Sequence, residues 1–280
     1  MPTQIITETE QLAKLRDNKV IGDLTLEESK LIFRGTGNIL FCDSLDSRIA
    51  LSRSRIEFHG DNSLVFLSGN WRNYMLGVTL YNDSVLFFGA NSYFNGNFYM
   101  TVGERQHTIF GGDSMFSWGC SAQNSDGHLV YDCATRARAN PGKSIVVGDH
   151  VWLGQGVTLL KGTRLGSGSI VGAHSTVAGK TVPSNTAWSG NPARQKSSGV
   201  FFHPSCVYGY EADDTEDAAV CDADEAAEFI FAQTAGETQD IDALLADINA
   251  LPTADERLKY LQSFAAQDAR NRFFIPPQGS

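Results

Sequence analysis

A six-residue repeat runs without interruption from Val147 to Val182, in the hexads VGDHVW, LGQGVT, LLKGTR, LGSGSI, VGAHST and VAGKTV. The first position of each hexad is aliphatic, and the second is glycine or alanine except at Leu160. A period of six fits neither an α-helix nor a simple alternating strand. It is typical of short strands joined by tight corners, with one large inward side chain per side and glycine where the backbone turns. The repeat therefore predicts an all-β fold, a parallel β-solenoid.

Upstream of the hexads, residues 30–117 contain short apolar bursts such as LIFRG, SLVFLSG and SVLFFG, separated by turns of Gly, Asn, Asp and Ser. Such bursts are strand signals. We interpret them as degenerate coils of the same solenoid, in which Phe and Tyr replace the smaller aliphatic residues. An independent β-domain is the alternative. Residues 118–144 then break the periodicity, and a loop that projects from a rigid scaffold is a common location of catalytic side chains.

The chain is predicted to have three parts. They are an N-terminal segment, residues 1–30; the solenoid with its projecting loop, residues 31–196; and a C-terminal extension, residues 197–280. The extension holds 16 acidic and 4 basic residues from position 211 onward, whereas residues 1–210 hold 16 acidic and 18 basic residues. The body is therefore slightly basic and the tail strongly acidic, so the net charge of −10 says little about the ligand.

The extension begins with an acidic stretch, residues 211–228, which contains nine carboxylates and no basic residue. Mutual repulsion predicts a solvated linker or an exposed helix there. Asp240 is predicted to cap one short helix, and Thr253 with Glu256 forms a capping-box pattern before a second. The apolar face of the second helix is predicted to pack against the solenoid or a neighbouring subunit.

Several classes of partner and compartment are disfavoured. No stripe is dense in Lys and Arg, which argues against nucleic acid. The five cysteines form no CxxC pair, which argues against structural zinc and a disulfide framework. The N-terminus lacks the apolar core of a signal peptide, and no apolar run approaches the roughly 20 residues that span a bilayer. We therefore expect a cytoplasmic protein without a membrane span.

The segment from DGHLVYD through ANPGKSIVVGDHVWLGQGVTLLKG to SGNPAR resembles the hexapeptide-repeat acyltransferases, which fold as left-handed parallel β-helices. Within that superfamily it looks most like the bacterial capsule polysaccharide O-acetyltransferases, including those that modify sialic-acid polymers. The resemblance is close over residues 111–196 and weaker upstream. It implies a homotrimer with active sites between adjacent subunits, and acetyl-CoA as the donor.

Acetyl transfer to a sugar hydroxyl requires a base that removes the hydroxyl proton as the oxygen attacks the thioester. Histidine suits this role because its unperturbed pKa lies near neutrality. His128, in the DGH…YD loop, matches the family's catalytic histidine and is the predicted base. Trp152 matches a tryptophan that the family needs for activity, and is predicted to hold pantetheine or donate a hydrogen bond near the thioester. Asp126 or Asp132 could orient the imidazole, although turn formation is the better interpretation of both.

Coenzyme A needs backbone groups along its pantetheine arm and cations at its phosphates. With the 18-residue coil of the family, Gln155 and Ala173 stack in adjacent coils and match positions where related enzymes contact pantetheine. Gly179 and Lys180 follow one hexad later, and Arg194 is the arginine of NPAR. Lys180 and Arg194 are predicted to pair with the phosphates; solvated surface cations are the alternative.

Metal chemistry is not expected. His150 and His174 share the fourth hexad position but lie on neighbouring faces, where both are predicted to point outward. The β-helical carbonic anhydrases use three histidines around a metal, and no such spacing is present here.

The favoured function is therefore an acetyl-CoA-dependent O-acetyltransferase that acts on a capsular or other surface polysaccharide. One alternative is an N-acetyltransferase of a nucleotide-linked amino sugar. Another is a non-catalytic solenoid scaffold, which the hexads alone would permit but His128, Trp152 and Lys180 argue against. The sequence does not identify the acceptor sugar. Aromatic residues such as Trp71 and Tyr93 either line a glycan groove or fill the core of the wider early coils.

Overall fold

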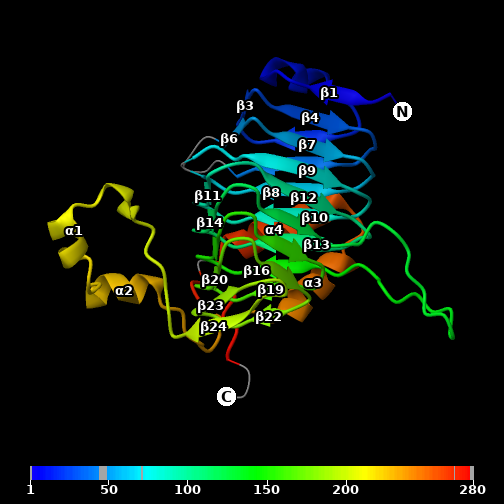
Figure 1. The fold of residues 1–280 in the computed structure, drawn as a ribbon. Helices are drawn as coiled ribbons and strands as arrows, with labels where there is room; N and C mark the ends of the chain where they lie inside the picture. The colour runs from blue at the N-terminus through cyan, green and yellow to red at the C-terminus, as the bar shows by residue number, and fades with distance from the viewer. Residues whose placement is uncertain (1, 44–48, 71, 268, 278–280) are drawn as a thin grey trace.

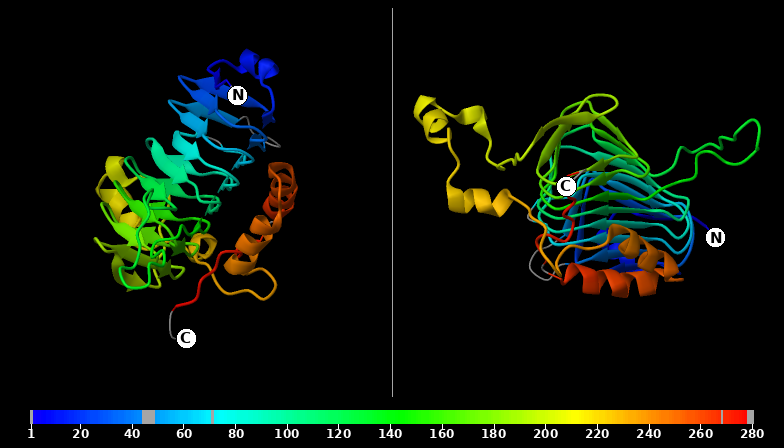
Figure 2. Two further views of the ribbon diagram at one scale, coloured as in Figure 1. Left: turned by 90° about the vertical axis from the view of Figure 1, so that its right-hand side faces the viewer. Right: turned by 90° about the horizontal axis from the view of Figure 1, so that it is seen from below.

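The computed structural model describes residues 2–43, 49–70, 72–267 and 269–277, and Trp71 lies outside them. Short parallel strands stack along one axis and form three sheets, one on each side of a triangular prism (Figure 1; Figure 2). The predicted left-handed parallel β-helix with a small helical C-terminal extension is confirmed.

The strands are assigned to the sheets as follows. The first sheet contains β1 (Gln4–Ile6), β4 (Lys30–Phe33), β7 (Arg55–Phe58), β9 (Leu76–Leu80), β12 (Phe98–Val102), β15 (Ser121–Gln123), β18 (Thr158–Leu160) and β21 (Thr176–Ala178). The second sheet contains β2 (Lys19–Ile21), β5 (Ile39–Cys42), β8 (Leu64–Leu67), β10 (Val85–Phe88), β13 (His107–Phe110), β16 (Ile145–Val147), β19 (Arg164–Leu165) and β22 (Thr181–Val182). The third sheet contains β11 (Tyr93–Phe94), β14 (Met115–Phe116), β17 (Trp152–Leu153), β20 (Ile170–Val171), β23 (Thr186–Ser189) and β24 (Arg194–Ser198), while β3 (Leu24–Glu27) and β6 (Ile49–Ser52) form a separate pair.

One coil of the hexad region is 18 residues long, as the resemblance implied. Trp152 pairs with Ile170 and Thr158 with Thr176, and each pair is one coil apart. The six aliphatic residues at the first hexad position are all fully buried: Val147, Leu153, Leu159, Leu165, Val171 and Val177. One large inward side chain per six residues thus fills the core of the narrow coils, and glycine occupies corners with positive φ, such as Gly156 at +67°.

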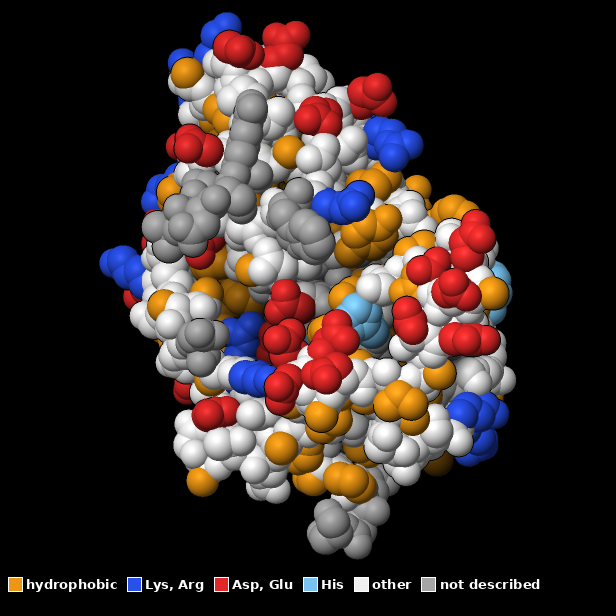
Figure 3. Space-filling view, turned by 90° about the vertical axis from the view of Figure 1, so that its left-hand side faces the viewer, with side chains coloured by type: hydrophobic (Ala, Val, Ile, Leu, Met, Phe, Trp, Pro, Cys, Tyr) orange, Lys and Arg blue, Asp and Glu red, His pale blue; other side chains and the backbone are white. Residues whose placement is uncertain are grey.

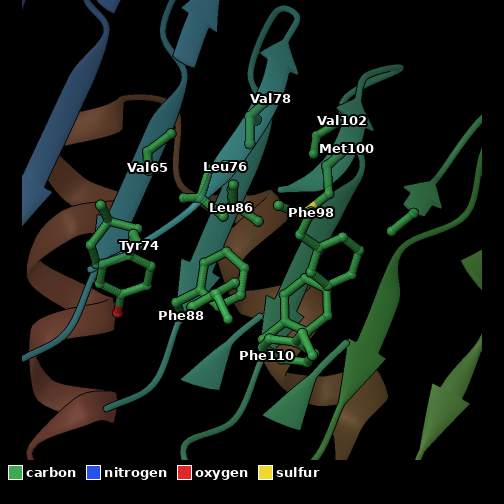
Figure 4. Packing of buried hydrophobic residues seen from close by; sticks show 14 of the residues in the cluster. Val65, Tyr74, Leu76, Val78, Leu86, Phe88, Phe98, Met100, Val102 and Phe110 are labelled. Atoms are coloured by element: carbon green, nitrogen blue, oxygen red, sulfur yellow. The ribbon is translucent and has the colours of Figure 1, made fainter. Parts of the chain in front are cut away.

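The earlier coils are wider, because 21 to 25 residues separate paired positions in neighbouring turns. Phenylalanine rings fill the extra width by stacking along the solenoid axis, as Phe33 does on Phe58 with 4.8 Å between ring centroids. Phe88 and Phe110 stack in the same way at 4.6 Å (Figure 4). The interpretation of these bursts as coils of one continuous solenoid is therefore confirmed.

Parallel pairing begins upstream of residue 31, the predicted start of the solenoid. β2 pairs with β5 and β3 with β6, so the first coil lies within the predicted N-terminal segment. β1 pairs antiparallel with β4, and the 3₁₀ helix η1 (Thr9–Lys14) follows it near the N-terminal end of the stack. The short apolar segments KVI and LTLE lack the hexad spacing, which is why the sequence alone placed the boundary later.

Two helices of the extension, α3 (Ile241–Ala250) and α4 (Ala254–Ala265), pack against the outer face of the second sheet. Their buried residues, including Leu258, Leu261 and Phe264, contact outward apolar side chains of the sheet such as Phe66 and Phe87. This contact explains why the strands of the second sheet are apolar on both faces. Of the two predicted partners for this helix face, the solenoid is the observed one.

The helix caps occur as predicted. The Asp240 carboxylate accepts hydrogen bonds from the backbone N–H groups of Asp242 and Ala243, and Thr253 with Glu256 forms a complete capping box.

His107 lies buried between the second sheet and α3, where its Nε2 is 3.1 Å from Oδ1 of Asn249. Burial, and after it the nearby Arg257 guanidinium, lowers the pKa of His107 to about 4. An unfolded histidine titrates near pH 6.5, so the unfolded chain binds the proton first on acidification. The stability that neutral His107 contributes is thus present above about pH 6.5 and lost as the pH falls toward 4.

We expect the free energy of unfolding to fall by about 2 kcal/mol between pH 7 and pH 4.5 through His107 alone. Urea denaturation at both values measures this, and His107→Gln, which does not titrate, serves as the control. The variant should lose less stability than the wild type over that range. Equal losses in the two proteins would contradict the assignment.

Between the solenoid and α3, the extension continues through an irregular segment, the 3₁₀ helix η2 (Val207–Gly209), α1 (Ala212–Asp217) and α2 (Ala223–Phe229). We call residues 201–231 the arm, because α1 and α2 project away from the solenoid (Figure 1). Neither helix contains a buried residue, so the prediction of an exposed acidic segment is confirmed. Within the described residues, no helix is long and apolar enough to cross a membrane.

Candidate active site

The residues between β15 and β16 form a long loop that projects from the corner between the first and second sheets, on the side opposite the arm (Figure 1; Figure 2). Tyr131 and Arg138 form an antiparallel bridge between its two limbs. His128 lies on the outgoing limb, and its side chain is exposed. The predicted projecting loop therefore exists, but it starts after β15 and not at residue 118. The imidazole is accessible to a second molecule.

A cluster of polar side chains holds the outgoing limb near His128. The Asn140 amide donates to the backbone oxygen of His128 at 2.8 Å and to Asp126 Oδ2 at 2.9 Å. Lys161 follows β18 in the next coil along the chain. Its Nζ donates to Asp126 Oδ2 at 2.5 Å and to the backbone oxygen of Asn140 at 3.2 Å. Lys161, and after it Asn140, lowers the pKa of Asp126. Both limbs are thereby fixed to the solenoid.

The two aspartates considered for orienting the imidazole have other partners in the structure. Asp132 accepts hydrogen bonds from the backbone N–H groups of Ala134 and Thr135 and from the Thr135 hydroxyl, which makes it a turn residue. Asp126 pairs with Lys161. The return limb is tied separately, because Glu104 binds Arg138 and accepts from the backbone N–H of Gly142 at 2.6 Å.

Replacing Lys161 tests whether this cluster positions His128. We expect Lys161→Ala to lower kcat for acetyl transfer about tenfold or more with little change in KM, since small displacements of catalytic groups are costly. Lys161→Arg should recover most of the activity by restoring the contact with Asp126. Lys19→Ala, which breaks an exposed ion pair with Asp255, is the control. Wild-type kcat in Lys161→Ala, measured by thiol release, would refute a positioning role.

Trp152 is the first residue of β17 in the third sheet, and its side chain is 39% exposed. Its ring centroid lies 5.8 Å from that of Phe202 in the arm. The indole is therefore at the surface and only partly covered.

The residues predicted to hold pantetheine lie at the corner between the third and first sheets. Gln155 and Ala173 occupy adjacent coils there, and both are exposed. The backbone oxygen of Gln155 accepts from the N–H of His174 at 2.7 Å. Arg194 opens β24 opposite Ser189, next to the same corner, and is also exposed.

Gly179 and Lys180 lie at a different corner, between the first and second sheets. Gly179 has a φ of +58°, and both residues are exposed one coil below Lys161. They share this corner with the loop that carries His128.

The predicted site residues are thus distributed over two corners and one face of the prism. His128, Gly179 and Lys180 lie at one corner, Gln155, Ala173 and Arg194 at another, and Trp152 lies on the third sheet. The second sheet separates the loop from Trp152, because the chain runs through β16 between them. A single chain does not bring His128 and Trp152 together.

His150 points away from the solenoid core, as predicted, but it is buried because the arm covers it. Its side chain stacks on Phe202, with ring centroids 4.0 Å apart and 3° between the planes, and on Phe229 at 4.8 Å. Its Nε2 is 3.0 Å from the backbone oxygen of Phe202, and burial lowers its pKa. The sequence did not indicate this burial, because the covering residue Phe202 lies 52 positions further along the chain. His174 is exposed, as predicted.

A large cleft of about 1740 Å³ lies between the solenoid and the extension, and we call it the extension cleft. Its solenoid wall includes Tyr93, Asp113, Asp149 and Trp152, and its other wall includes Phe202, Phe229 and Arg272. Sequence reasoning placed Trp152 near a ligand but missed this cleft, because its walls come from segments far apart in the sequence, such as Asp149 and Arg272, which are 123 positions apart. Among the described residues, no cluster of His, Cys, Asp and Glu could hold a metal ion.

The left-handed β-helix and its hexads are those of the hexapeptide-repeat transferases. The family model "Bacterial transferase hexapeptide (six repeats)" matches residues 144–179. WbbJ of Escherichia coli (strain K12), a suggested O-acetyl transferase of lipopolysaccharide biosynthesis, is 31% identical over 134 residues, which cover 44% of this chain and 67% of WbbJ. The chain belongs to the hexapeptide-repeat transferase family.

Among its relatives, a polysialic acid O-acetyltransferase of Neisseria meningitidis is 35% identical over 109 residues, 39% of this chain. That match spans only 50% of the Neisseria protein's length. The crystal structure of the polySia specific acetyltransferase NeuO superposes with a TM-score of 0.60 at 25% identity, covering 72% of this chain and 96% of NeuO.

Proposed function

We propose that this protein is an O-acetyltransferase that moves an acetyl group from acetyl-CoA to a sugar hydroxyl of a capsular or other surface polysaccharide. His128 acts as the general base and removes the hydroxyl proton while the oxygen attacks the thioester carbon. The relatives named above as O-acetyltransferases support the reaction. The observation that carries the assignment of the base is the exposed His128 on a loop whose limbs are fixed by Asn140 and Lys161.

Two copies are needed to complete the site, because one chain keeps His128 and Trp152 apart. In a homotrimer, the projecting loop of one subunit can reach the third sheet of the next subunit, or the corner between its third and first sheets. The coenzyme would then lie in the interface between subunits, with Gln155 and Ala173 beside its pantetheine group. Lys180 and Arg194 are exposed cations suited to its phosphates. A cytoplasmic location suits a donor such as acetyl-CoA.

The test is incubation of the purified protein with acetyl-CoA and a panel of capsular polysaccharides. Release of coenzyme A thiol together with new O-acetyl esters, seen by NMR or mass spectrometry, is the expected result. Acetylation of an amino group instead would replace this function with N-acetyl transfer. A protein that neither binds acetyl-CoA nor releases thiol with any acceptor would be a scaffold. Sedimentation equilibrium checks the trimer independently.

A further inference from the structure

The extension cleft lies beside Trp152 and has the size and lining of a glycan site. Its volume of about 1740 Å³ exceeds the few hundred to one thousand Å³ of typical small-molecule pockets. Tyr93 and Trp152 supply aromatic surface on the solenoid side, and the exposed Tyr208 supplies it on the arm. Aromatic faces bind the C–H faces of sugar rings, so the cleft offers stacking surface on both walls.

The cations of the cleft already have partners. Among the described residues that line it, the basic side chains are Arg72, Arg270 and Arg272. Arg272 forms a two-point ion pair with Asp149, at 2.9 and 3.2 Å. Arg270 donates to the backbone oxygen of Ile230 at 3.1 Å and to that of Ala227. Arg72 lies over the Tyr93 ring, 4.8 Å from its centroid.

Carboxylates outnumber these cations in and around the cleft. Asp43, Asp113, Asp149 and Glu228 line it. Desolvation in the cleft, and after it the nearby Asp149, raises the pKa of Asp113, which means that a further negative charge there is unfavourable. Glu228 is the last of the nine carboxylates of residues 211–228, and acidic side chains gather on the face of the molecule that carries the arm (Figure 3).

We propose that the extension cleft binds the acceptor glycan and that its negative charge selects a glycan without carboxylates. This inference rests on the proposed acetyltransferase function, and it separates this chain from relatives named for polysialic acid, a polymer with one carboxylate per sugar. Like charges placed against each other in an interface oppose binding. Neutral sugar hydroxyls, in contrast, can donate hydrogen bonds to the Asp113 carboxylate.

Calorimetric titration of the full-length protein with tetrasaccharides of equal length tests the charge selection without any turnover. The probes are sialic acid, glucose, galactose and N-acetylglucosamine tetramers. We expect at least one neutral tetramer to bind ten times more tightly than the sialic acid tetramer. Equal or tighter binding of the sialic acid tetramer, or no binding by any neutral one, would overturn the proposal. Failure of the proposed function would show separately, as no thiol release from acetyl-CoA with any acceptor.

Variants locate the binding site and the source of its charge. Tyr93→Ala should weaken binding of the neutral tetramer fivefold or more, whereas Tyr99→Ala, an exposed tyrosine of the first sheet outside this cleft, should not. Glu228→Gln, which removes a carboxylate from the cleft wall, should tighten binding of the sialic acid tetramer at least threefold. Its matched control, Glu10→Gln, neutralises one exposed carboxylate near the N-terminal end of the stack. Unchanged binding in both cleft variants would contradict the assignment.

Discussion

Replacement of His128 by alanine should reduce acetyl transfer about 10²- to 10⁴-fold, the usual contribution of a general base. The imidazole is exposed on the projecting loop, and the hydrogen bond that Asn140 makes there goes to the backbone oxygen of His128. Removing the side chain therefore leaves the loop contacts in place, and stability should be unchanged. Steady-state thiol release measures kcat, and thermal unfolding checks the fold.

His59→Ala is the control for this experiment, since His59 is also a partly exposed histidine, with its Nδ1 3.5 Å from Glu57 on the first sheet. It should retain wild-type activity. If His128→Ala keeps more than about a tenth of the wild-type rate, another group must remove the proton.

Mixing His128→Ala with Trp152→Ala subunits adds a test of the shared site: partial recovery of activity is expected only if the two residues come from different chains.

The largest effect on stability is expected from Phe110→Ala, at about 3–5 kcal/mol. The Phe110 ring is fully buried, stacks on Phe88 and meets Phe98 and Phe116 edge-on (Figure 4). Each coil of a solenoid contacts only its neighbours, so a cavity here weakens the interface between consecutive coils. Urea unfolding monitored by circular dichroism gives the free energy difference.

Tyr208→Ala is the matched comparison, because this ring is 97% exposed on the arm. It should change the free energy of unfolding by less than about 0.5 kcal/mol. A loss below about 1 kcal/mol in Phe110→Ala would mean that the wide coils can collapse around the missing ring.

The hexads made most of the fold predictable because each position has one structural role. The first position faces inward and the glycines turn the corners, so the six-residue sides follow from the spacing, while the 18-residue coil came from the family resemblance. The wider coils were harder to predict from the sequence because they lack the six-residue spacing. Their core is filled instead by rings that stack between turns, such as Phe33, Phe58 and Phe88. Local capping signals at Asp240 and Thr253 also identified both packed helices correctly.

The site was predictable only in part, because its geometry depends on contacts between distant segments. The resemblance named His128 and Trp152, but only the structure places them on opposite sides of the second sheet. The burial of His150 under Phe202 and Phe229 depends on how the arm folds back, which no local pattern encodes. The Lys161 contact with Asp126 likewise joins residues 35 positions apart.

The coil register is preserved across the projecting loop. Ser121 pairs with Thr158 although 37 residues separate them, whereas Asp149 and Ser167 in neighbouring coils are only 18 apart. The additional residues therefore leave at a corner and return without shifting any strand. A corner of this prism thus accepts an insertion at almost no structural penalty, so loops could be exchanged between family members as interchangeable modules. Evolution, or a designer, can change what such an enzyme recognises while the stack beneath stays the same.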